Sequence, residues 1–421
     1  MGWSARRWWR MTTAACLVVV IGLMSIEVGM LVKQRSTKNP VRPVTTTRIN
    51  EWTRQKLQHV EPKQGTDTMS APNPCQPNHR FVFIKIHKTG SSTIATMLQR
   101  YGYRRDLTFA LPSGAVHSFP MSNQRYRFDT PRLVFQWNLT DRSGALVWPA
   151  LGGYQVLVNH ALYNRTVDEI LIPNAVYFTM IREPLARTES FFRYFLFDQA
   201  VPHKANEDPL EVFMRDPQRH TQKMRENNWT KYFRNGQFFS LGLKREDYDN
   251  LRVVEAAINS LSRGMDLVML NEYFDESLLL LKKLMCWDFQ DIVYISKGVR
   301  RPSGNHKSIP AGLRDKILRW NAADLRLYQH FNRTFWTKVQ KYGPEFLHDL
   351  DTFRAMKESA TQACMATGSR HWDWHNSSYW KLPPNASERC RDYTRDDNAW
   401  VNLIRSRMRA KSSAFIKYSN G

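Results

Sequence analysis

Two short stretches of the chain carry the residue types that hold phosphate groups. In residues 81–93 (FVFIKIHKTGSST), an apolar run ends in two bases, the second of them Lys88, and glycine and hydroxyl residues follow. In residues 175–190, an apolar run ends at Arg182, and Ser190 follows eight positions later. Backbone N–H groups at the start of a helix bind anions well, together with a lysine or an arginine. Both stretches therefore predict anion binding.

The first stretch differs from the loop that binds nucleoside triphosphates. That loop, GxxxxGK[ST], places its lysine after the second glycine and directly before Ser or Thr. Here Lys88 precedes the only glycine, Gly90, which disfavours a kinase or ATPase of the P-loop type. Alternatives remain for each stretch alone: a buried strand with an ordinary capped helix, and a salt bridge from Arg182 to Glu183 or Glu189.

Apolar runs and helical patterns alternate along the chain, and the strands and helices that they predict must position the two anion-binding stretches. One strand is expected to end near His87, with a helix from Thr93, and further helices are expected after Pro184, from Asp275 as N-cap, and over residues 313–331. Four more runs are expected to form buried strands: residues 154–160, 175–181, 266–273 and 291–296. This alternation predicts an α/β fold with a central, mainly parallel sheet flanked by helices.

A histidine at the end of one expected strand has the chemistry of a general base. His160 closes YQVLVNH, at the sheet edge where ligands of parallel sheets bind. A neutral imidazole there can take the proton of an attacking hydroxyl. A structural role is the alternative for His160, and His87 is the competing base. The neighbouring Asn159 is expected to orient the acceptor or the imidazole ring.

Taken together, IHKTGSST and FTMIREPLARTES resemble the two sites with which sulfotransferases bind the donor 3′-phosphoadenosine 5′-phosphosulfate (PAPS). The family that the chain resembles is the galactose-3-O-sulfotransferases, which include galactosylceramide sulfotransferases. The resemblance extends over residues 81–345, at LTFALP, NHALYN, YFDESLLLLKKLMCW and LYQHFNRTFW. It implies a fold related to the P-loop nucleotide kinases, and sulfate transfer from PAPS to the 3-hydroxyl of a terminal β-galactose on a glycolipid or glycoprotein.

The resemblance also implies roles for individual residues. Lys88 would stabilise the charge that develops on the leaving phosphate, with His87 in support, and His160 would be the base. The residues implied at the 5′-phosphosulfate are Lys85, His87, Lys88, Thr89, Gly90, Ser91, Ser92 and Thr93. Arg182 and Ser190 are implied at the 3′-phosphate. Arg300 and Arg301 are candidates to close over the nucleotide. The alternative is that they belong to a solvated basic loop. No metal is required for the transfer.

The N-terminal region predicts a membrane-anchored protein of the secretory pathway. Residues 12–32 are largely apolar and long enough to span a bilayer, although they contain Glu27. We therefore expect a cytoplasmic tail at 1–11 and a lumenal stem at 33–80. Six N-x-S/T sequons favour a lumenal face: Asn138, Asn164, Asn228, Asn332, Asn376 and Asn385. The resemblance implies a single-pass type II protein of the Golgi membrane.

Four cysteines follow the anchor and allow two disulfides in any of three pairings: Cys75, Cys286, Cys364 and Cys390. Residues 346–421 are expected to be part of the catalytic domain or to pack on it. Within them, HWDWH (371–375) is interpreted as a surface or sugar-contacting segment rather than a metal site.

The net charge of +23 favours an anionic partner, but the anchor and the sequons disfavour nucleic acid. Two alternative functions remain: a sulfotransferase of the same fold that acts on a glycosaminoglycan sugar, and a non-catalytic lumenal glycan-binding protein. The sequence leaves open whether the acceptor is a glycolipid or a glycoprotein, which linkage precedes the galactose, and the oligomeric state, a homodimer included.

Overall fold

The computed structural model describes residues 75–111, 154–224, 227, 229–297, 309–365, 369–373 and 378–419. The predicted anchor at 12–32 lies outside these residues, as does most of the predicted stem. Among the helices in the described ranges, none is both long and apolar enough to cross a bilayer.

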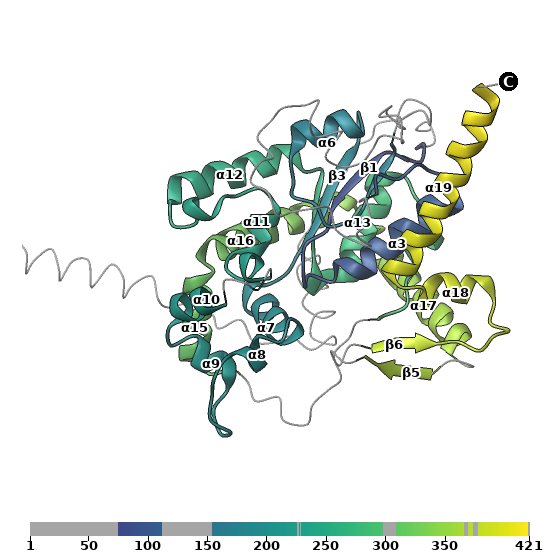
Figure 1. Ribbon diagram of the computed structural model, residues 1–421. Helices are drawn as coiled ribbons and strands as arrows, with labels where there is room; N and C mark the ends of the chain where they lie inside the picture. The colour runs from purple at the N-terminus through teal and green to yellow at the C-terminus, as the bar shows by residue number, and fades with distance from the viewer. Residues whose placement is uncertain are drawn as a thin grey trace, which may run out of the picture. The chain divides into compact units, whose positions relative to one another are not determined.

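A four-stranded parallel sheet forms the centre of the fold (Figure 1). Its strands, in spatial order, are β2 (Val156–Leu157), β1 (Phe81–Ile84), β3 (Val176–Ile181) and β4 (Leu267–Leu270). Phe81 pairs with Val156 on one side and with Val176 on the other. Every residue of β1 and β4 is buried, as is usual when helices cover both faces of a parallel sheet. The predicted α/β fold with a central parallel sheet is confirmed.

One predicted strand is wrong. Residues 291–296 begin inside a short helix, α14 (Phe289–Ile292), and then continue without regular structure. Asp288 and Asp291 form a capping box at the start of α14, in which each side chain accepts a hydrogen bond from the backbone of the other. The capping box satisfies the first N–H groups of the helix. The stretch therefore starts as a helix, although its short apolar run is typical of a strand.

The helices that follow the strands lie close to their predicted positions. α3 (Ser91–Arg104) follows β1, and α7 (Pro184–Tyr194) follows β3 and begins at Pro184. α13 (Phe274–Met285) follows β4 through the 3₁₀ turn η3 (Asn271–Tyr273). Asp275 lies inside α13 rather than at its N-cap, and its carboxylate pairs with Lys357 at 2.6 Å.

The long helix expected near 313–331 is divided at Asn321 into α15 (Ala311–Trp320) and α16 (Ala322–Tyr342). Between β2 and β4 the chain also forms several shorter elements: α6 (Arg165–Leu171), α8 (Phe197–Ala200), α9 (Pro209–Phe213), α10 (Pro217–Lys223), η1 (Thr230–Tyr232), α11 (Gly236–Ser240), η2 (Arg245–Asp247) and α12 (Leu251–Gly264).

A cluster of buried aromatic side chains holds α7 against the helices after it. Its members come from α7, α8, α9, η1 and the residue that follows η1, and they include Phe191, Phe192, Phe197, Phe213, Tyr232 and Phe233. Burial of each large side chain contributes about 1.5–3 kcal/mol. The position of α7, which starts directly after β3, is therefore set by packing.

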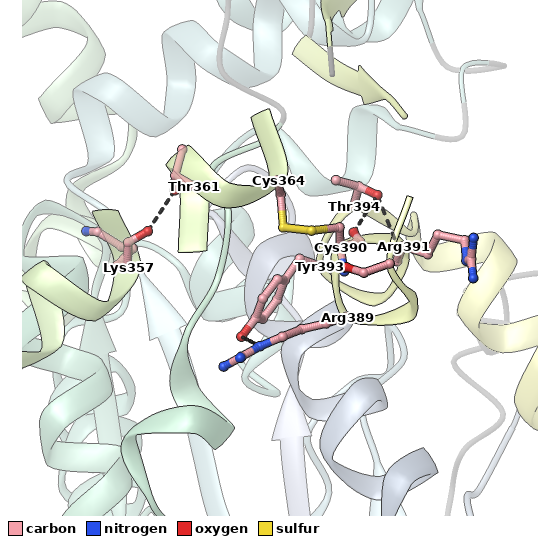
Figure 2. Close-up of a disulfide and its surroundings, with 9 residues drawn as sticks. Lys357, Thr361, Cys364, Arg389, Cys390, Arg391, Tyr393 and Thr394 are labelled. Carbon is pink, nitrogen blue, oxygen red and sulfur yellow. Dashed lines mark hydrogen bonds between the residues drawn. A yellow bond between two sulfur atoms is a disulfide. The ribbon is translucent and has the colours of Figure 1, made fainter. Parts of the chain in front are cut away.

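The C-terminal region consists of α17 (Phe346–Met365), a hairpin of β5 (Ser369–Trp372) and β6 (Ser378–Lys381), α18 (Glu388–Thr394) and α19 (Asp397–Ser419). Figure 1 shows α19 beside α3, and the two helices are in contact. Figure 2 shows the disulfide Cys364–Cys390, which joins the end of α17 to α18. A second disulfide, Cys75–Cys286, joins the segment before β1 to the residue after α13. The prediction of two disulfides is confirmed, with one pairing of the three.

Candidate active site

All four strands of the sheet end at the same edge, and the residues after each strand contact one another there. His160 follows β2 and donates a hydrogen bond from Nδ1 to the carbonyl of Lys85, which follows β1, at 2.8 Å. Arg182 follows β3 and donates from Nη1 to the carbonyl of Lys88 at 3.3 Å. Asn271 follows β4 and donates to the carbonyl of Thr89 at 3.1 Å. The two predicted stretches and His160 are therefore brought together, where ligands of parallel sheets bind.

The turn between β1 and α3 is held by its own hydroxyl groups. Thr89 Oγ1 donates to the carbonyl of Ile86 at 3.1 Å, and Ser91 Oγ donates to the same carbonyl. Both side chains are buried, whereas Ser92 is exposed and Thr93 is half-buried. The hydroxyls of Thr89 and Ser91 thus fix the shape of the turn, and this segment can offer an anion its backbone N–H groups and the hydroxyls of Ser92 and Thr93.

Gly90 is required at its position by two independent features. Its φ is +79°, in the left-handed region that side chains disfavour. A Cβ on Gly90 would also lie 2.4 Å from Asn271 Nδ2 and 3.1 Å from the ring of Phe274. The glycine therefore allows η3 and α13 to pack directly on the turn, at the N-terminus of α3.

Lys88 is held over an aromatic ring at the end of α7. Its φ of 64° places it in the left-handed region, and its Nζ lies 3.5 Å from the centroid of the Tyr194 ring. Burial raises the pKa of Tyr194, and the carboxylate of Asp373 adds to this shift. Tyr194 therefore presents a neutral ring to the ammonium group, a stable arrangement for a partly desolvated cation.

The backbone of Arg182 is fixed by one amide side chain. Gln237 Oε1 accepts from the Arg182 N–H at 2.7 Å, and Gln237 Nε2 donates to the Arg182 carbonyl at 2.9 Å. Gln237 itself lies in α11, where its N–H and that of Phe238 donate to the buried carboxylate of Asp324. Burial raises the pKa of Asp324.

The Arg182 side chain is half-buried, and its guanidinium is incompletely hydrogen-bonded at a buried nitrogen. Its Nε has no hydrogen-bond partner within the part of the chain that the structure describes. Burial lowers the pKa of Arg182, while nearby acids, Glu272 first, oppose the shift. The two acids considered as ion-pair partners are engaged elsewhere: Glu183 accepts from the Ala186 N–H at 2.8 Å, and Glu189 lies 3.5 Å from Arg193. An unpaired buried donor on a cationic group fits an anionic ligand such as a phosphate.

Arg187 has a different role from Arg182, although both lie near the same helix end. Its guanidinium donates to the carbonyls of Phe233 at 2.9 Å, Tyr232 and His87 at 3.4 Å. Burial lowers the pKa of Arg187 to about 10. Arg187 therefore holds η1 and the β1–α3 turn together. Ser190 lies one turn further along α7 and is half-buried.

The two candidate bases are in direct contact. The rings of His87 and His160 are stacked with centroids 3.8 Å apart, and both side chains are buried. Because a carbonyl only accepts, His160 Nδ1 carries a hydrogen toward Lys85, and a neutral His160 ring then has its lone pair on Nε2. His87 also contacts the rings of Trp229 at 5.3 Å and Tyr232 at 4.8 Å. The geometry assigns a definite tautomer to neutral His160 but not to His87.

Asn159 precedes His160 and is fully buried. Neither its Oδ1 nor its Nδ2 has a hydrogen-bond partner among the described residues. A buried amide without partners costs free energy. The sequence interpretation of Asn159 as an orienting residue is compatible with these unused hydrogen-bonding groups.

Other predicted residues lie away from this edge or outside the described ranges. The ammonium of Lys85 forms an ion pair with Asp397, at the start of α19. Arg300 and Arg301 fall outside the described residues, as do the sequons at Asn138, Asn228 and Asn376. The remaining sequons lie before α6, in α16 and before α18: Asn164, Asn332 and Asn385. Within the described ranges, no group of three or more His, Cys, Asp or Glu residues could hold a metal ion.

The comparison with protein families decides the class of this site. The family model for galactose-3-O-sulfotransferases matches residues 39–383. The chain belongs to the galactose-3-O-sulfotransferase family. Membership makes it a sulfotransferase, and the matched region contains the whole sheet edge described above.

Curated members of the galactose-3-O-sulfotransferase family align over most of the chain. A galactosylceramide sulfotransferase from Bos taurus is 33% identical over 314 residues, which cover 73% of this chain and 69% of the relative. Galactose-3-O-sulfotransferase 3 from Homo sapiens is 33% identical over 277 residues, which cover 64% of this chain and 60% of the relative. Galactose-3-O-sulfotransferase 2 from Sus scrofa is 30% identical over 294 residues, which cover 68% of this chain and 69% of the relative.

Sequence reasoning missed several residues that shape the site. Asn271 was placed inside the strand expected at 266–273, whereas β4 ends at Leu270 and Asn271 is the first residue after it. Gln237 and Tyr194 act through contacts between segments that are distant in the sequence, for which the chain gives no local signal.

Proposed function

We propose that the chain transfers the sulfuryl group of PAPS to the 3-hydroxyl of a terminal β-galactose. The observation that carries the proposal is the contact between the two predicted stretches: Arg182, with its unpaired buried Nε, reaches the Lys88 carbonyl at the sheet edge. Family membership supports both PAPS as donor and galactose as acceptor. A fold related to the P-loop nucleotide kinases is part of the proposal, supported by the parallel sheet and the strand–turn–helix of β1 and α3.

The donor would be held at two places. Backbone N–H groups of residues 89–92, at the N-terminus of α3, and the Thr93 hydroxyl would bind the 5′-phosphate, with the Lys88 ammonium near the sulfuryl oxygens. Arg182 and Ser190 would bind the 3′-phosphate, and His87 would assist Lys88. Lys85, Arg300 and Arg301 remain predicted donor ligands, and the ion pair between Lys85 and Asp397 makes an indirect role the simpler one for Lys85.

His160 would act as the general base. The acceptor oxygen attacks sulfur, the bond from sulfur to the bridging phosphate oxygen breaks, and the acceptor proton moves to His160 Nε2. The nucleotide leaves as 3′-phosphoadenosine 5′-phosphate, and Lys88 stabilises the charge that develops on its 5′-phosphate. The hydrogen bond from Nδ1 to the Lys85 carbonyl is what supports His160 over His87 as the base. No step in this scheme uses a metal ion.

The acceptor and the cellular location extend the proposal. A galactosylceramide-like glycolipid is supported by the relatives named galactosylceramide sulfotransferase, and a glycoprotein glycan by the other relatives. A single-pass type II protein of the Golgi membrane, with its catalytic domain in the lumen, is supported by the apolar segment at 12–32, the sequons and the two disulfides.

An acceptor panel tests the proposal directly. The full-length chain is incubated with ³⁵S-labelled PAPS and galactosylceramide, lactosylceramide, Galβ1-3 and Galβ1-4 glycans, and chondroitin. Linkage analysis of the product is expected to place the label on O3 of galactose. Labelling of chondroitin alone, or of another galactose position, would contradict the proposed acceptor.

A further inference from the structure

Asp397, the first residue of α19, connects the C-terminal helices to the candidate active site. One carboxylate oxygen pairs with Lys85 Nζ, and the other accepts a hydrogen bond from Gln99 Nε2 at 2.7 Å. The Lys85 side chain is only 2% exposed. A buried ammonium requires a partner, because an unpaired charge is strongly disfavoured away from water. Asp397 therefore determines where the Lys85 side chain lies.

Lys85 carries the second half of the connection through its backbone. It is the first residue after β1, and its carbonyl accepts the hydrogen bond from His160 Nδ1. A carbonyl in this position fixes both the tautomer and the ring orientation of a histidine. Lys85 is thus held by Asp397 through its side chain and holds His160 through its carbonyl.

We propose that Asp397 is a positioning residue for sulfuryl transfer, which fixes Lys85 and through it orients His160. The inference rests on the proposed function, in which His160 accepts the proton of the galactose hydroxyl. The family match ends at residue 383, so α19 reaches the site from beyond the matched region. A displaced base lowers the rate of the chemical step even when both substrates bind normally.

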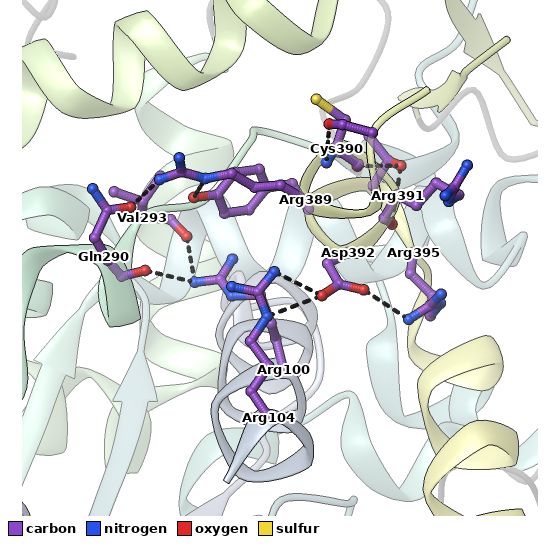
Figure 3. A network of polar contacts seen from close by, with 12 residues as sticks. Arg100, Arg104, Gln290, Val293, Arg389, Cys390, Arg391, Asp392 and Arg395 are labelled. Carbon is purple, nitrogen blue, oxygen red and sulfur yellow. Dashed lines mark hydrogen bonds and ion pairs between the residues drawn. The ribbon is translucent and has the colours of Figure 1, made fainter. Parts of the chain in front are cut away.

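Asp392 offers a matched control. It lies in the neighbouring α18, and its side chain is 6% exposed. Its carboxylate accepts hydrogen bonds from Arg104, at the end of α3, at 2.9 and 3.1 Å, and from Arg395 at 2.9 Å (Figure 3). Asp392 therefore ties the C-terminal helices to α3 as Asp397 does, but through residues that do not belong to the β1–α3 turn.

The test measures kcat and both KM values for Asp397→Asn and Asp392→Asn in the full-length chain, each in wild-type and His160→Ala backgrounds. PAPS is the donor and galactosylceramide the acceptor. We expect Asp397→Asn to lower kcat about tenfold or more with little change in KM, and Asp392→Asn to change kcat by less than about twofold. In the His160→Ala background, Asp397→Asn should lower kcat by less than about twofold, because the residue through which it acts is absent.

Three results would overturn the inference alone. The first is an impaired His160→Ala beside a fully active Asp397→Asn. The second is an equal loss of kcat in Asp392→Asn, and the third is an equal Asp397→Asn effect in both backgrounds. Full activity of His160→Ala would overturn the assigned base and this inference with it. If Asp397→Asn does not fold, Gln99→Met removes one hydrogen bond to Asp397 without leaving a charge unpaired. A fall in kcat of about threefold then supports the inference, and an unchanged kcat overturns it.

Discussion

Two arginines show how the sheet edge differs from the part of α3 that packs on α14 and the C-terminal helices. Arg100, in α3, donates from Nη2 to the carbonyl of Asp291 at 2.8 Å. It also donates to the carbonyls of Gln290 and Val293, at 3.3 and 2.7 Å (Figure 3). Arg182, at the sheet edge, makes one hydrogen bond to Lys88 and has an unpaired Nε within the described residues. Burial lowers the pKa of both, that of Arg100 to about 10. One arginine is thus bound to three carbonyls of the protein, and the other retains a buried donor for a ligand.

Backbone conformation also differs between the sheet edge and the contact of α3 with α19. Around the sheet edge, Lys88 and Gly90 both adopt positive φ values of 64° and 79°. The contact between α3 and α19 consists of regular helices joined by the hydrogen bond from Gln99 to Asp397 at 2.7 Å, and a positive φ of 58° occurs just beyond the end of α3, at Asp106. Unfavourable backbone geometry is typical of functional sites, where the surrounding structure maintains it.

The largest expected effect is on activity, from removal of the charge at the sheet edge. Lys88→Met keeps the length of the side chain but not its charge, so the leaving phosphate loses electrostatic stabilisation. We expect kcat for sulfate transfer to fall about 10²–10³-fold, with a melting temperature close to that of the wild type. A kcat within about threefold of the wild type would place the reactive phosphosulfate elsewhere.

A backbone change at the same edge should affect stability and binding together. Gly90→Ala introduces a Cβ at positive φ that lies 2.4 Å from Asn271 Nδ2. We expect the free energy of unfolding in urea to fall by about 2–4 kcal/mol and donor affinity to weaken, because the turn must move. If Gly90→Ala retains full stability, the close packing of η3 on this turn is not required.

Where α3 packs on α14, by contrast, loss of an arginine should affect stability alone. Arg100→Met leaves three carbonyls without their donor, which should lower the free energy of unfolding by about 1–3 kcal/mol. Nucleotide binding by calorimetry should be unchanged. A large loss of nucleotide affinity in Arg100→Met would remove the distinction between the two regions.

The smallest effect is expected at the more exposed end of the same helix. The Arg104 side chain is 45% exposed, and its partner Asp392 retains Arg395. Arg104→Gln should change the free energy of unfolding by about 1 kcal/mol or less, measured by urea denaturation. A loss as large as that of Arg100→Met would mean that exposure does not separate these two residues.

The sequence predicted the sheet edge better than its surroundings because strand ends carry local signals. Lys88, Arg182 and His160 each close an apolar run, and parallel strands must end at one edge. Gln237 and Asp397 could not be predicted, because each acts on a residue far away in the chain through a contact that depends on the complete fold. The strand predicted at 291–296 failed for a local reason, the capping box of Asp288, which the apolar pattern concealed.

The central claim is that the two stretches form one donor site in which Arg182 binds the 3′-phosphate. Calorimetry on the wild type and Arg182→Gln, with 3′-phosphoadenosine 5′-phosphate and adenosine 5′-phosphate, tests it most directly. The wild type should prefer the bisphosphate, and Arg182→Gln should reduce that preference about tenfold or more, because a hydrogen bond between charged groups is lost. The same preference in both proteins would contradict the account.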